Sequence, residues 1–253
     1  LLAPLGLPAD VATIVVPTGI LHGLPWATLP GLAGRETIIA PSAVAWLEGV
    51  CRRPAIGRRG PGNVVLIAGP ELPGALDEVQ RLGALYSRRP TGTTELITGA
   101  DATAEVVLAA LAGADVVHLA AHGSFRADSP LFSSVLLADG PLTVYELERV
   151  GRAPRTVVLA SCDAAVSAVH LGDELLGTAS ALIGLGVGAV VAPVMPVPDG
   201  ATTEFMVALH RHLLTGDSAA AALAHAGQGY DHAVAATFVC IGCDDGASAG
   251  ATG

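Results

Sequence analysis

Short apolar segments rich in β-branched residues recur along the chain, and most of them are continuous rather than alternating. Continuous apolar runs are typical of strands that are covered on both faces. We therefore predict strands at residues 13–17, 37–40, 63–69, 95–98, 115–120, 156–161, 188–192 and 237–242. Segments with helical periodicity separate them, at residues 75–86, 102–112, 143–150, 173–184, 202–214 and 218–226. This alternation predicts an α/β fold in which a mostly parallel central sheet carries helices on both faces.

An arginine-rich stretch divides the chain near its N-terminus. Residues 51–62 combine arginine with glycine and proline, a composition that predicts an exposed linker. The linker would separate an N-terminal extension, residues 1–50, from an α/β body at residues 63–243 and a flexible tail at residues 244–253. We expect a single domain over the whole chain. Because the chain begins with Leu1 rather than Met, we also expect it to be the C-terminal part of a longer protein.

One uncharged stretch, residues 177–198, is long enough to span a bilayer. It is broken by glycines and then by prolines, at Gly184, Gly186, Gly188, Pro193, Pro196 and Pro198. Such breaks favour a buried helix, a tight turn and a buried strand over a membrane helix. A chain this long and apolar does not need disulfides, so we expect four reduced cysteines and a cytoplasmic protein without membrane attachment.

The charged residues exclude several reaction classes. All 13 basic residues are arginines, so chemistry that needs a lysine is excluded, including Schiff-base, P-loop and protein-kinase mechanisms. A net charge of −10 also disfavours nucleic-acid binding, because neutralising phosphates needs a surplus of cations. The expected partners are therefore proteins, peptides or small molecules.

Two predicted strands end in reactive side chains. The strand at residues 115–120 leads to His122, and the strand at residues 156–161 leads to Cys162. Catalytic groups in open α/β sheets gather beyond the carboxyl ends of the strands, so the two side chains would emerge together if these strands are neighbours. An imidazole beside a thiol favours the nucleophilic thiolate. Spacing alone leaves open the alternative of a small buried cysteine and an unrelated histidine.

The residues around this pair add an oxyanion site but no third catalytic group. Gly123 lacks a Cβ, so its backbone N–H can approach a substrate oxygen, and the N–H of Cys162 would supply a second donor. His118 lies near in the sequence, but strand periodicity makes it at least as consistent with a hydrogen-bonded residue of the sheet interior. We therefore favour a two-residue arrangement of His122 and Cys162.

Short motifs in a fixed order cover nearly the whole chain. They are VVPTGILHGLPWATL at residues 15–29, Pro41-Ser42, Glu78-Val79, HLAAHG at 118–123, Pro130 with Ser133, Leu142-Thr143, VVLASCD at 157–163, GDELLG at 172–177 and GAVVA at 188–192. In this order and spacing, the chain resembles the CHAT family, caspase-like cysteine peptidase domains that often follow helical repeats in bacterial proteins.

The resemblance has direct implications for fold and function. It implies a three-layer caspase-like sandwich of clan CD, a catalytic dyad of His122 and Cys162, and cleavage of protein substrates through a thioester without a metal or cofactor. It also implies regulation by an attached helical-repeat domain or an activating partner. The chain departs from the family pattern at residues 195–199, MPVPD, where many members carry a tryptophan ahead of Val-x-Asp. In the family these residues usually form one wall of the site, so the departure concerns that wall and leaves the dyad unaffected.

Three acidic residues follow the nucleophile. Asp163, Asp173 and Glu174 would line a first subsite for a basic residue, as acidic pockets do in several clan CD peptidases. The alternative is structural, because Asp173 and Glu174 also suit the N-terminal end of the helix that follows.

The remaining Cys and His residues indicate no further chemistry. Cys240 and Cys243 have no second pair at zinc-site spacing and belong to a predicted terminal strand. Four histidines, His210, His212, His225 and His232, lack acidic companions at H-E-x-x-H spacing, so we expect surface residues and no metal site.

Two other functions compete with a peptidase. A caspase-fold interaction module would keep the fold and leave the dyad idle. A Cys–His glutaminase would usually set its cysteine in a Gly-x-Cys-x-Gly elbow, and no glycine flanks Cys162 in this way. We therefore favour a cytoplasmic cysteine endopeptidase.

Overall fold

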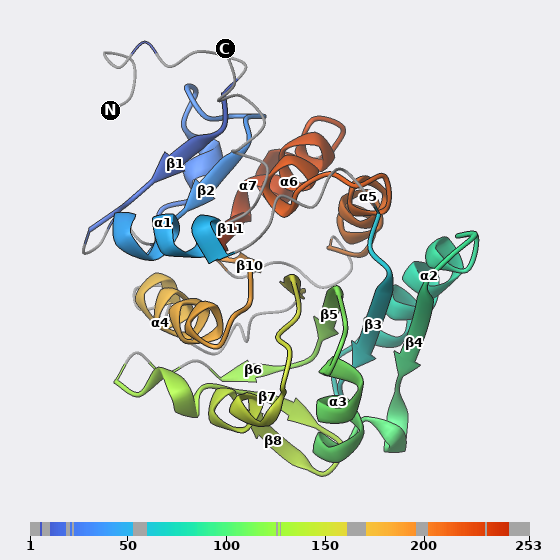
Figure 1. Ribbon diagram of the computed structural model, residues 1–253. Helices are drawn as coiled ribbons and strands as arrows, with labels where there is room; N and C mark the ends of the chain where they lie inside the picture. Colours follow the sequence, from blue (N-terminus) through green and yellow to red (C-terminus); the bar gives the residue numbers. More distant parts are fainter. Residues whose placement is uncertain are drawn as a thin grey trace.

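The computed structural model describes residues 6, 11–18, 21, 23–52, 60–124, 126, 128–160, 171–195, 202–230 and 232–242, with the backbone alone at residues 51, 52, 171–174, 232 and 233. Eight strands form the central sheet in the spatial order β1-β2-β11-β10-β9-β5-β3-β4 (Figure 1). They are β1 Thr13–Val15, β2 Thr37–Ile39, β3 Asn63–Ala68, β4 Thr93–Ile97, β5 Val116–Ala120, β9 Thr156–Leu159, β10 Ala189–Pro193 and β11 Phe238–Gly242. Neighbouring strands are parallel except β10 and β11, which confirms the predicted mostly parallel sheet.

The N-terminal section supplies two strands of this sheet. β1 pairs with β2, and β2 pairs with β11, so all three run opposite to the other five strands. The predicted boundary between an extension and an α/β body is therefore not a boundary of the sheet. The predicted exposed linker at residues 51–62 overlaps α1 (Ala43–Arg52) at its start, and at its end Gly60 and Gly62 are exposed whereas Pro61 is buried. Residues 53–59 lie outside the described residues.

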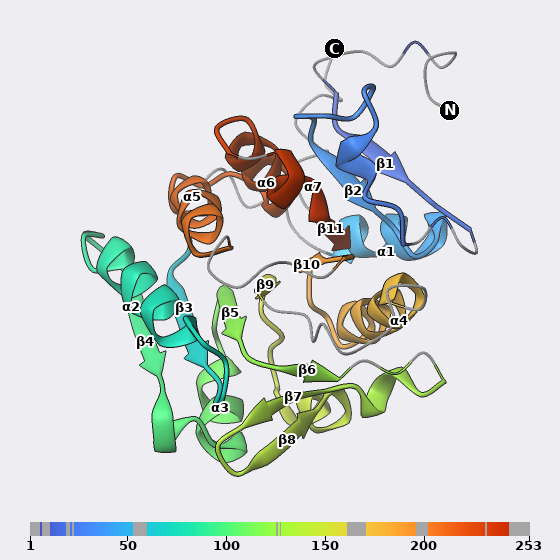
Figure 2. The ribbon, with the colours of Figure 1, turned by 180° about the vertical axis from the view of Figure 1, so that it is seen from behind.

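Helices cover both faces of the sheet, as predicted (Figures 1 and 2). One face carries α2 (Ala75–Tyr86), α5 (Thr202–Leu214), α6 (Ala219–Gly227) and α7 (His232–Thr237), and the other carries α3 (Ala104–Leu111) and α4 (Leu171–Gly184). Successive residues of a strand point to opposite faces. In β3, Val65 and Ile67 join the core under α3 and α4, whereas Val64 and Leu66 join the core under α2 and α5. Two buried faces explain why the strands are continuously apolar.

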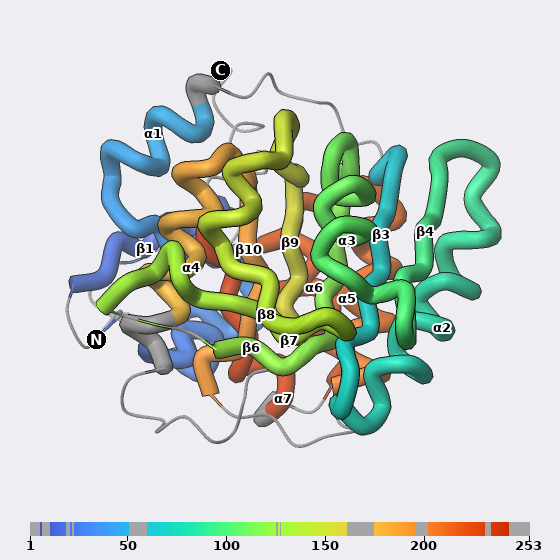
Figure 3. The backbone as a smooth tube through the Cα atoms, turned by 90° about the horizontal axis from the view of Figure 1, so that it is seen from below, coloured from blue at the N-terminus to red at the C-terminus, as the bar shows by residue number. Residues whose placement is uncertain are grey.

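A second, three-stranded sheet follows β5 and was not predicted. It consists of β6 (Gly123–Ser124), β7 (Ser134–Leu137) and β8 (Gly140–Thr143), joined in antiparallel order, and lies on the α3 and α4 side of the central sheet (Figure 3). The predicted helix at residues 143–150 is the 3₁₀ helix η6 (Val144–Arg149), which begins with a capping box of Thr143 and Glu146. Other 3₁₀ helices among the described residues include η3 (Trp26–Thr28), η4 (Gly99–Asp101) and η5 (Pro130–Phe132).

The uncharged stretch at residues 177–198 folds as expected over its described part. α4 ends at Gly184, and β10 begins at Ala189 in the middle of the sheet. Among the helices that the structure describes, none has the length and apolar character needed to cross a membrane.

Candidate active site

The two strands that lead to His122 and Cys162 are parallel neighbours. β5 and β9 align with Leu119 opposite Leu159, and the N–H of Ala160 donates to the carbonyl of Leu119 at 3.0 Å. His122 follows the end of β5 by two residues and is partly exposed. Cys162 follows Ala160 by two residues in the sequence and lies outside the described residues. The condition on which the prediction depended, that the two strands are neighbours, is met. The contact between the two side chains stays a prediction.

The loop after β3 holds the imidazole of His122. Its Nε2 lies 3.1 Å from the backbone oxygen of Glu71. A carbonyl oxygen can only accept a hydrogen bond, so in the neutral ring Nε2 carries the proton and Nδ1 is the basic nitrogen. Glu71 has a φ of 61°, the left-handed region that residues other than glycine seldom adopt. Strained backbone of this kind concentrates at functional sites. Sequence reasoning missed Glu71 because a carbonyl group leaves no signal in residue type.

Gly69 permits the close approach that places this loop beside His122. A Cβ on Gly69 would lie 2.5 Å from the Cβ of Ala121 and 2.8 Å from the backbone oxygen of Leu136. Both contacts are shorter than side chains tolerate, so any other residue would move the end of β3 away from Ala121. The loop after β3 would then lie farther from His122, the residue after Ala121. The glycine after the apolar strand at residues 63–68 was the available sequence signal for this approach.

The backbone of Gly123 is oriented away from its own small sheet. Gly123 is opposite Val135 in β7, and the N–H of Leu136 donates to the carbonyl of His122 at 2.8 Å. This pattern makes Gly123 and Val135 a non-hydrogen-bonded pair, in which the N–H of each residue points away from the partner strand. β6 is an edge strand of the small sheet. The N–H of Gly123 therefore points to the side of β6 opposite β7, where no further strand of the small sheet pairs with it.

The helix that carries the predicted subsite acids packs against the loop after β6. Thr178 Oγ1 donates to Ser133 Oγ at 2.7 Å, and Ser133 is fully buried. A Cβ on Gly177 would lie 2.9 Å from Pro130 Cγ, so a glycine is needed for α4 to approach η5 this closely. These contacts give a structural reason for the motif residues Gly177, Pro130 and Ser133.

The acids themselves are only partly located. Asp173 and Glu174 are the third and fourth residues of α4, which begins at Leu171, and their side chains are not described. Asp163 lies outside the described residues. Their predicted role in substrate binding therefore stays a prediction.

A buried polar chain connects α2, β5 and α5 on the other face of the sheet. Glu78 Oε1 lies 2.9 Å from His118 Nε2, His118 Nδ1 lies 3.1 Å from His210 Nε2, and His210 Nδ1 lies 2.8 Å from the Tyr86 hydroxyl. All four residues are at most 3% exposed. Burial, and secondarily the neighbouring His118, lowers the pKa of His210 well below its ordinary value, and burial raises the pKa of Tyr86. In the neutral arrangement Tyr86 donates to His210, His210 to His118, and His118 to Glu78.

These contacts test two interpretations of the sequence. His118 is a hydrogen-bonded residue of the sheet interior, and both of its ring nitrogens are occupied. The prediction that His210 lies on the surface is wrong, because it faces Tyr86 and His118 on the inner side of α5. Cys240 is buried in β11, as predicted for a terminal core strand, and Cys243 lies outside the described residues.

The other predicted surface histidines differ from one another. His212 is partly exposed and His225 is exposed, and both contact Asp217, an acidic companion that is not at H-E-x-x-H spacing. The side chain of His232 is not described.

Comparison with solved structures identifies proteins with a similar fold. Separase from Saccharomyces cerevisiae, solved in complex with securin, gives a TM-score of 0.65 at 14% identity over 92% of this chain and 16% of that chain. The Arg-specific cysteine proteinase gingipain R gives a TM-score of 0.58 at 12% identity over 90% of this chain and 58% of that chain. The protein thus spans only part of the length of both matched chains. Comparison with curated protein sequences gave no match.

Comparison with family profiles gives a match over most of the sequence. The CHAT domain profile matches residues 2–233. The structural neighbours share the caspase-like architecture of a mostly parallel sheet between helices. The chain belongs to the CHAT domain family and has the fold of the clan CD caspase-like peptidases.

Proposed function

We propose that the protein is a cysteine endopeptidase in which Cys162 is the nucleophile and His122 is the general acid and base. The observation that carries this proposal is the register of β5 and β9, which pairs Leu119 with Leu159 at one edge of the sheet, three residues before His122 and Cys162 respectively. The loop carbonyl of Glu71 supports the assignment of His122, because it engages Nε2 and leaves Nδ1 as the basic nitrogen.

In this mechanism the proton on the Cys162 thiol passes to Nδ1 of His122. The thiolate attacks the scissile carbonyl carbon, and the carbonyl oxygen becomes an oxyanion that accepts hydrogen bonds from the N–H groups of Gly123 and Cys162. The tetrahedral intermediate collapses to a thioester as His122 returns the proton to the leaving amine. A water molecule then gives a proton to His122 and attacks the thioester, which releases the carboxyl product and restores the thiol.

We further propose that the first subsite takes a basic side chain. Asp173 and Glu174 are in the first turn of α4, and η5 holds this helix next to the loop that follows His122 and Gly123. The fold likeness to an Arg-specific cysteine proteinase is consistent with an acidic subsite that includes Asp163. The alternative is that the acids only stabilise the helix N-terminus. Because the chain has no lysine, a peptidase of this specificity would process itself after arginine, first of all in residues 52–59.

Control of the activity is the third part of the proposal. We propose that an attached helical-repeat domain or a protein partner activates the enzyme in the cytoplasm, where the thiol stays reduced. The structural neighbour separase was solved with a protein partner, securin, which makes partner control plausible for the fold.

Peptide-library cleavage by wild type, Cys162→Ala and His122→Asn tests the function. We expect cleavage by the wild type alone, with Arg favoured over Leu at the first subsite. Equal cleavage after Arg and Leu would contradict a subsite for basic side chains, without contradicting the proposed dyad. Cleavage by Cys162→Ala would contradict the dyad itself, and no cleavage with or without the upstream domain would favour the interaction module.

A further inference from the structure

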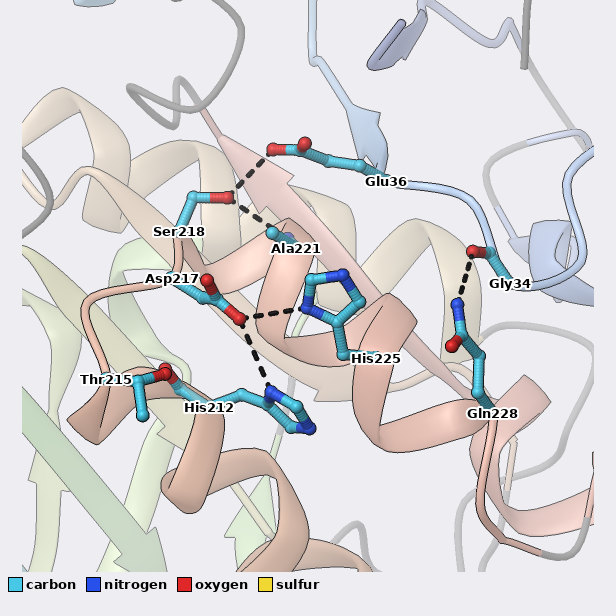
Figure 4. A network of polar contacts seen from close by, with 9 residues as sticks. All are labelled: Gly34, Glu36, His212, Thr215, Asp217, Ser218, Ala221, His225 and Gln228. Carbon is cyan, nitrogen blue, oxygen red and sulfur yellow. Dashed lines mark hydrogen bonds and ion pairs between the residues drawn. The ribbon is translucent and has the colours of Figure 1, made fainter. Parts of the chain in front are cut away.

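Three metal-ligating side chains meet where α5 ends and α6 begins, well away from His122. His212 is in the last turn of α5, Asp217 precedes the N-cap of α6, and His225 is in the last turn of α6. Figure 4 shows the two imidazole rings turned toward one carboxylate. One ligand atom from each residue lies within 4.8 Å of the others. The spacing of five and eight residues matches no short metal motif, so only the fold brings the three together.

The distances between the three side chains are close to those of a tetrahedral site. Asp217 Oδ2 lies 2.9 Å from His225 Nδ1 and 3.3 Å from His212 Nδ1. Tetrahedral ligands at about 2.0–2.1 Å from a zinc ion are about 3.3 Å from one another. The ring centroids of His212 and His225 are 5.1 Å apart with planes inclined by 44°, so the two rings are tilted and not stacked face to face. Small side-chain rotations would therefore suffice to place an ion between the three atoms.

Neighbouring hydrogen bonds hold the backbone of the cluster. The N–H of Asp217 and the Thr215 hydroxyl both donate to the carbonyl of His212, at 3.2 and 2.8 Å. Ser218 caps α6 by accepting from the N–H of Ala221 at 3.0 Å, and its hydroxyl donates to Glu36 at 2.8 Å. The carboxylate of Asp217 is only 13% exposed, whereas the two imidazoles are 38% and 46% exposed. The acid is thus fixed in place and the histidines remain accessible to an ion.

We propose that His212, Asp217 and His225 bind a divalent transition-metal ion, with zinc as the preferred ion. Two imidazoles and one carboxylate are ligands that suit zinc, whereas calcium and magnesium prefer oxygen ligands throughout. Three protein ligands leave the fourth tetrahedral position for water. Binding exchanges the protons on the two Nδ1 atoms for the ion and neutralises the carboxylate.

A bound ion would stabilise the packing of α5 against α6. The ion joins the C-terminal ends of α5 and α6, and the Ser218–Glu36 hydrogen bond continues the connection to the segment before β2. The proposed metal site is also separate from the proposed dyad. The backbone oxygen of Leu214, at the end of α5, adjoins Gly60 near the start of β3, whereas Glu71 and His122 meet beyond the other end of that strand. The inference therefore goes beyond the peptidase function and does not depend on it.

Zinc binding by the full chain tests the proposal. The Cys162→Ala protein is the background, so that the reactive thiol cannot bind zinc, and the double variant Asp217→Asn/His225→Gln removes two ligands. His232→Gln is the control for histidine loss outside the cluster. Equilibrium dialysis should give one zinc per chain in the background and in the control. The double variant should bind roughly 100-fold more weakly or worse, since even outer-shell changes cost 10- to 100-fold.

Two further readouts separate ligation from misfolding. Zinc should raise the melting temperature of the background by several degrees and leave that of the double variant unchanged, while the two proteins melt alike in a chelator. Cobalt should give the visible absorption of a tetrahedral site only when all three ligands are present. Absence of stoichiometric zinc in the background, or equal binding by the folded double variant, would overturn the proposal.

Discussion

His118 and His122 are four residues apart along the same run of chain, and their surroundings differ in every respect that matters for catalysis. His118 is fully buried, and both ring nitrogens are occupied by Glu78 and His210. His122 is partly exposed, and its Nε2 contacts the backbone oxygen of Glu71. A general base needs one nitrogen that is oriented and another that can exchange protons. The comparison shows that β5 carries one histidine suited to holding the fold together, and that a second histidine, two residues beyond its end, is suited to chemistry.

The first prediction separates the two histidines by activity. His122→Asn should lower kcat/KM for a cleaved peptide by roughly 100- to 10,000-fold, because it removes the general acid and base. Its free energy of unfolding should change by no more than about 1.5 kcal/mol, the typical net value of one hydrogen bond. Peptide hydrolysis and urea unfolding of the same sample make the comparison. If the His122→Asn protein stays active, another residue must act as the general acid and base.

The second prediction separates the two histidines by stability. His118→Ala leaves the carboxylate of Glu78 buried without its partner, which should cost about 3–5 kcal/mol in unfolding free energy. The double variant Glu78→Leu/His118→Leu removes both polar groups and should recover much of that loss. Urea unfolding measures both. If His118→Ala is as stable as His122→Asn, the buried chain does not stabilise the fold.

The third prediction concerns pH, through His210. Burial lowers the pKa of His210, so below about pH 6.5, the ordinary value for histidine, the unfolded chain binds a proton that the folded chain does not. The contribution of His210 to the free energy of unfolding is fully present above that pH. It decreases as the pH falls, by about 1.4 kcal/mol per pH unit. Urea unfolding between about pH 6.5 and 5 should show the wild type losing stability more steeply than His210→Gln. Parallel curves for the two proteins would contradict the neutral, buried state of His210.

The fourth and smallest effect concerns the loop that orients His122. Glu71→Gly keeps the backbone carbonyl and suits the positive φ, so unfolding free energy should change by less than about 1 kcal/mol. Peptide cleavage should stay within a few-fold of wild type. Glu71→Pro is the matched contrast, because proline cannot adopt this φ, and it should lose most activity. A large loss in Glu71→Gly would show that the Glu71 side chain, and not its carbonyl, is what His122 needs.

The sheet and its helices could be predicted because their signals are local. α2 and α5 have the predicted bounds, since apolar residues recur at helical spacing between clear starts and ends. β6, β7 and β8 have two to four residues each, too few for periodicity to show. Membership of β1 and β2 in the central sheet depends on pairing with β11, about 200 residues away, which no local pattern encodes.

The site could be predicted only where residue type carries the chemistry. His122 was found from its place after an apolar strand, whereas the Glu71 carbonyl depends on backbone conformation. The burial of His210 and the clustering of His212 with Asp217 and His225 arise from tertiary packing of α5 against its neighbours. Both His210 and His212 were predicted on the surface because neither has an acidic companion at H-E-x-x-H spacing, although His210 is buried and His212 is partly exposed.

The most direct test of the proposed dyad is covalent labelling of Cys162. The probe is an Arg-containing peptide with a thiol-reactive group at the position of the scissile bond, used with and without the proposed activating domain or partner. The adduct is located by intact-mass and peptide mass spectrometry. We predict one adduct per chain, on Cys162, formed at least 100-fold more slowly in His122→Asn, the lower bound expected for loss of a general base. Labelling of Cys162 that is no faster than that of Cys51, or that is unchanged in His122→Asn, would contradict the account.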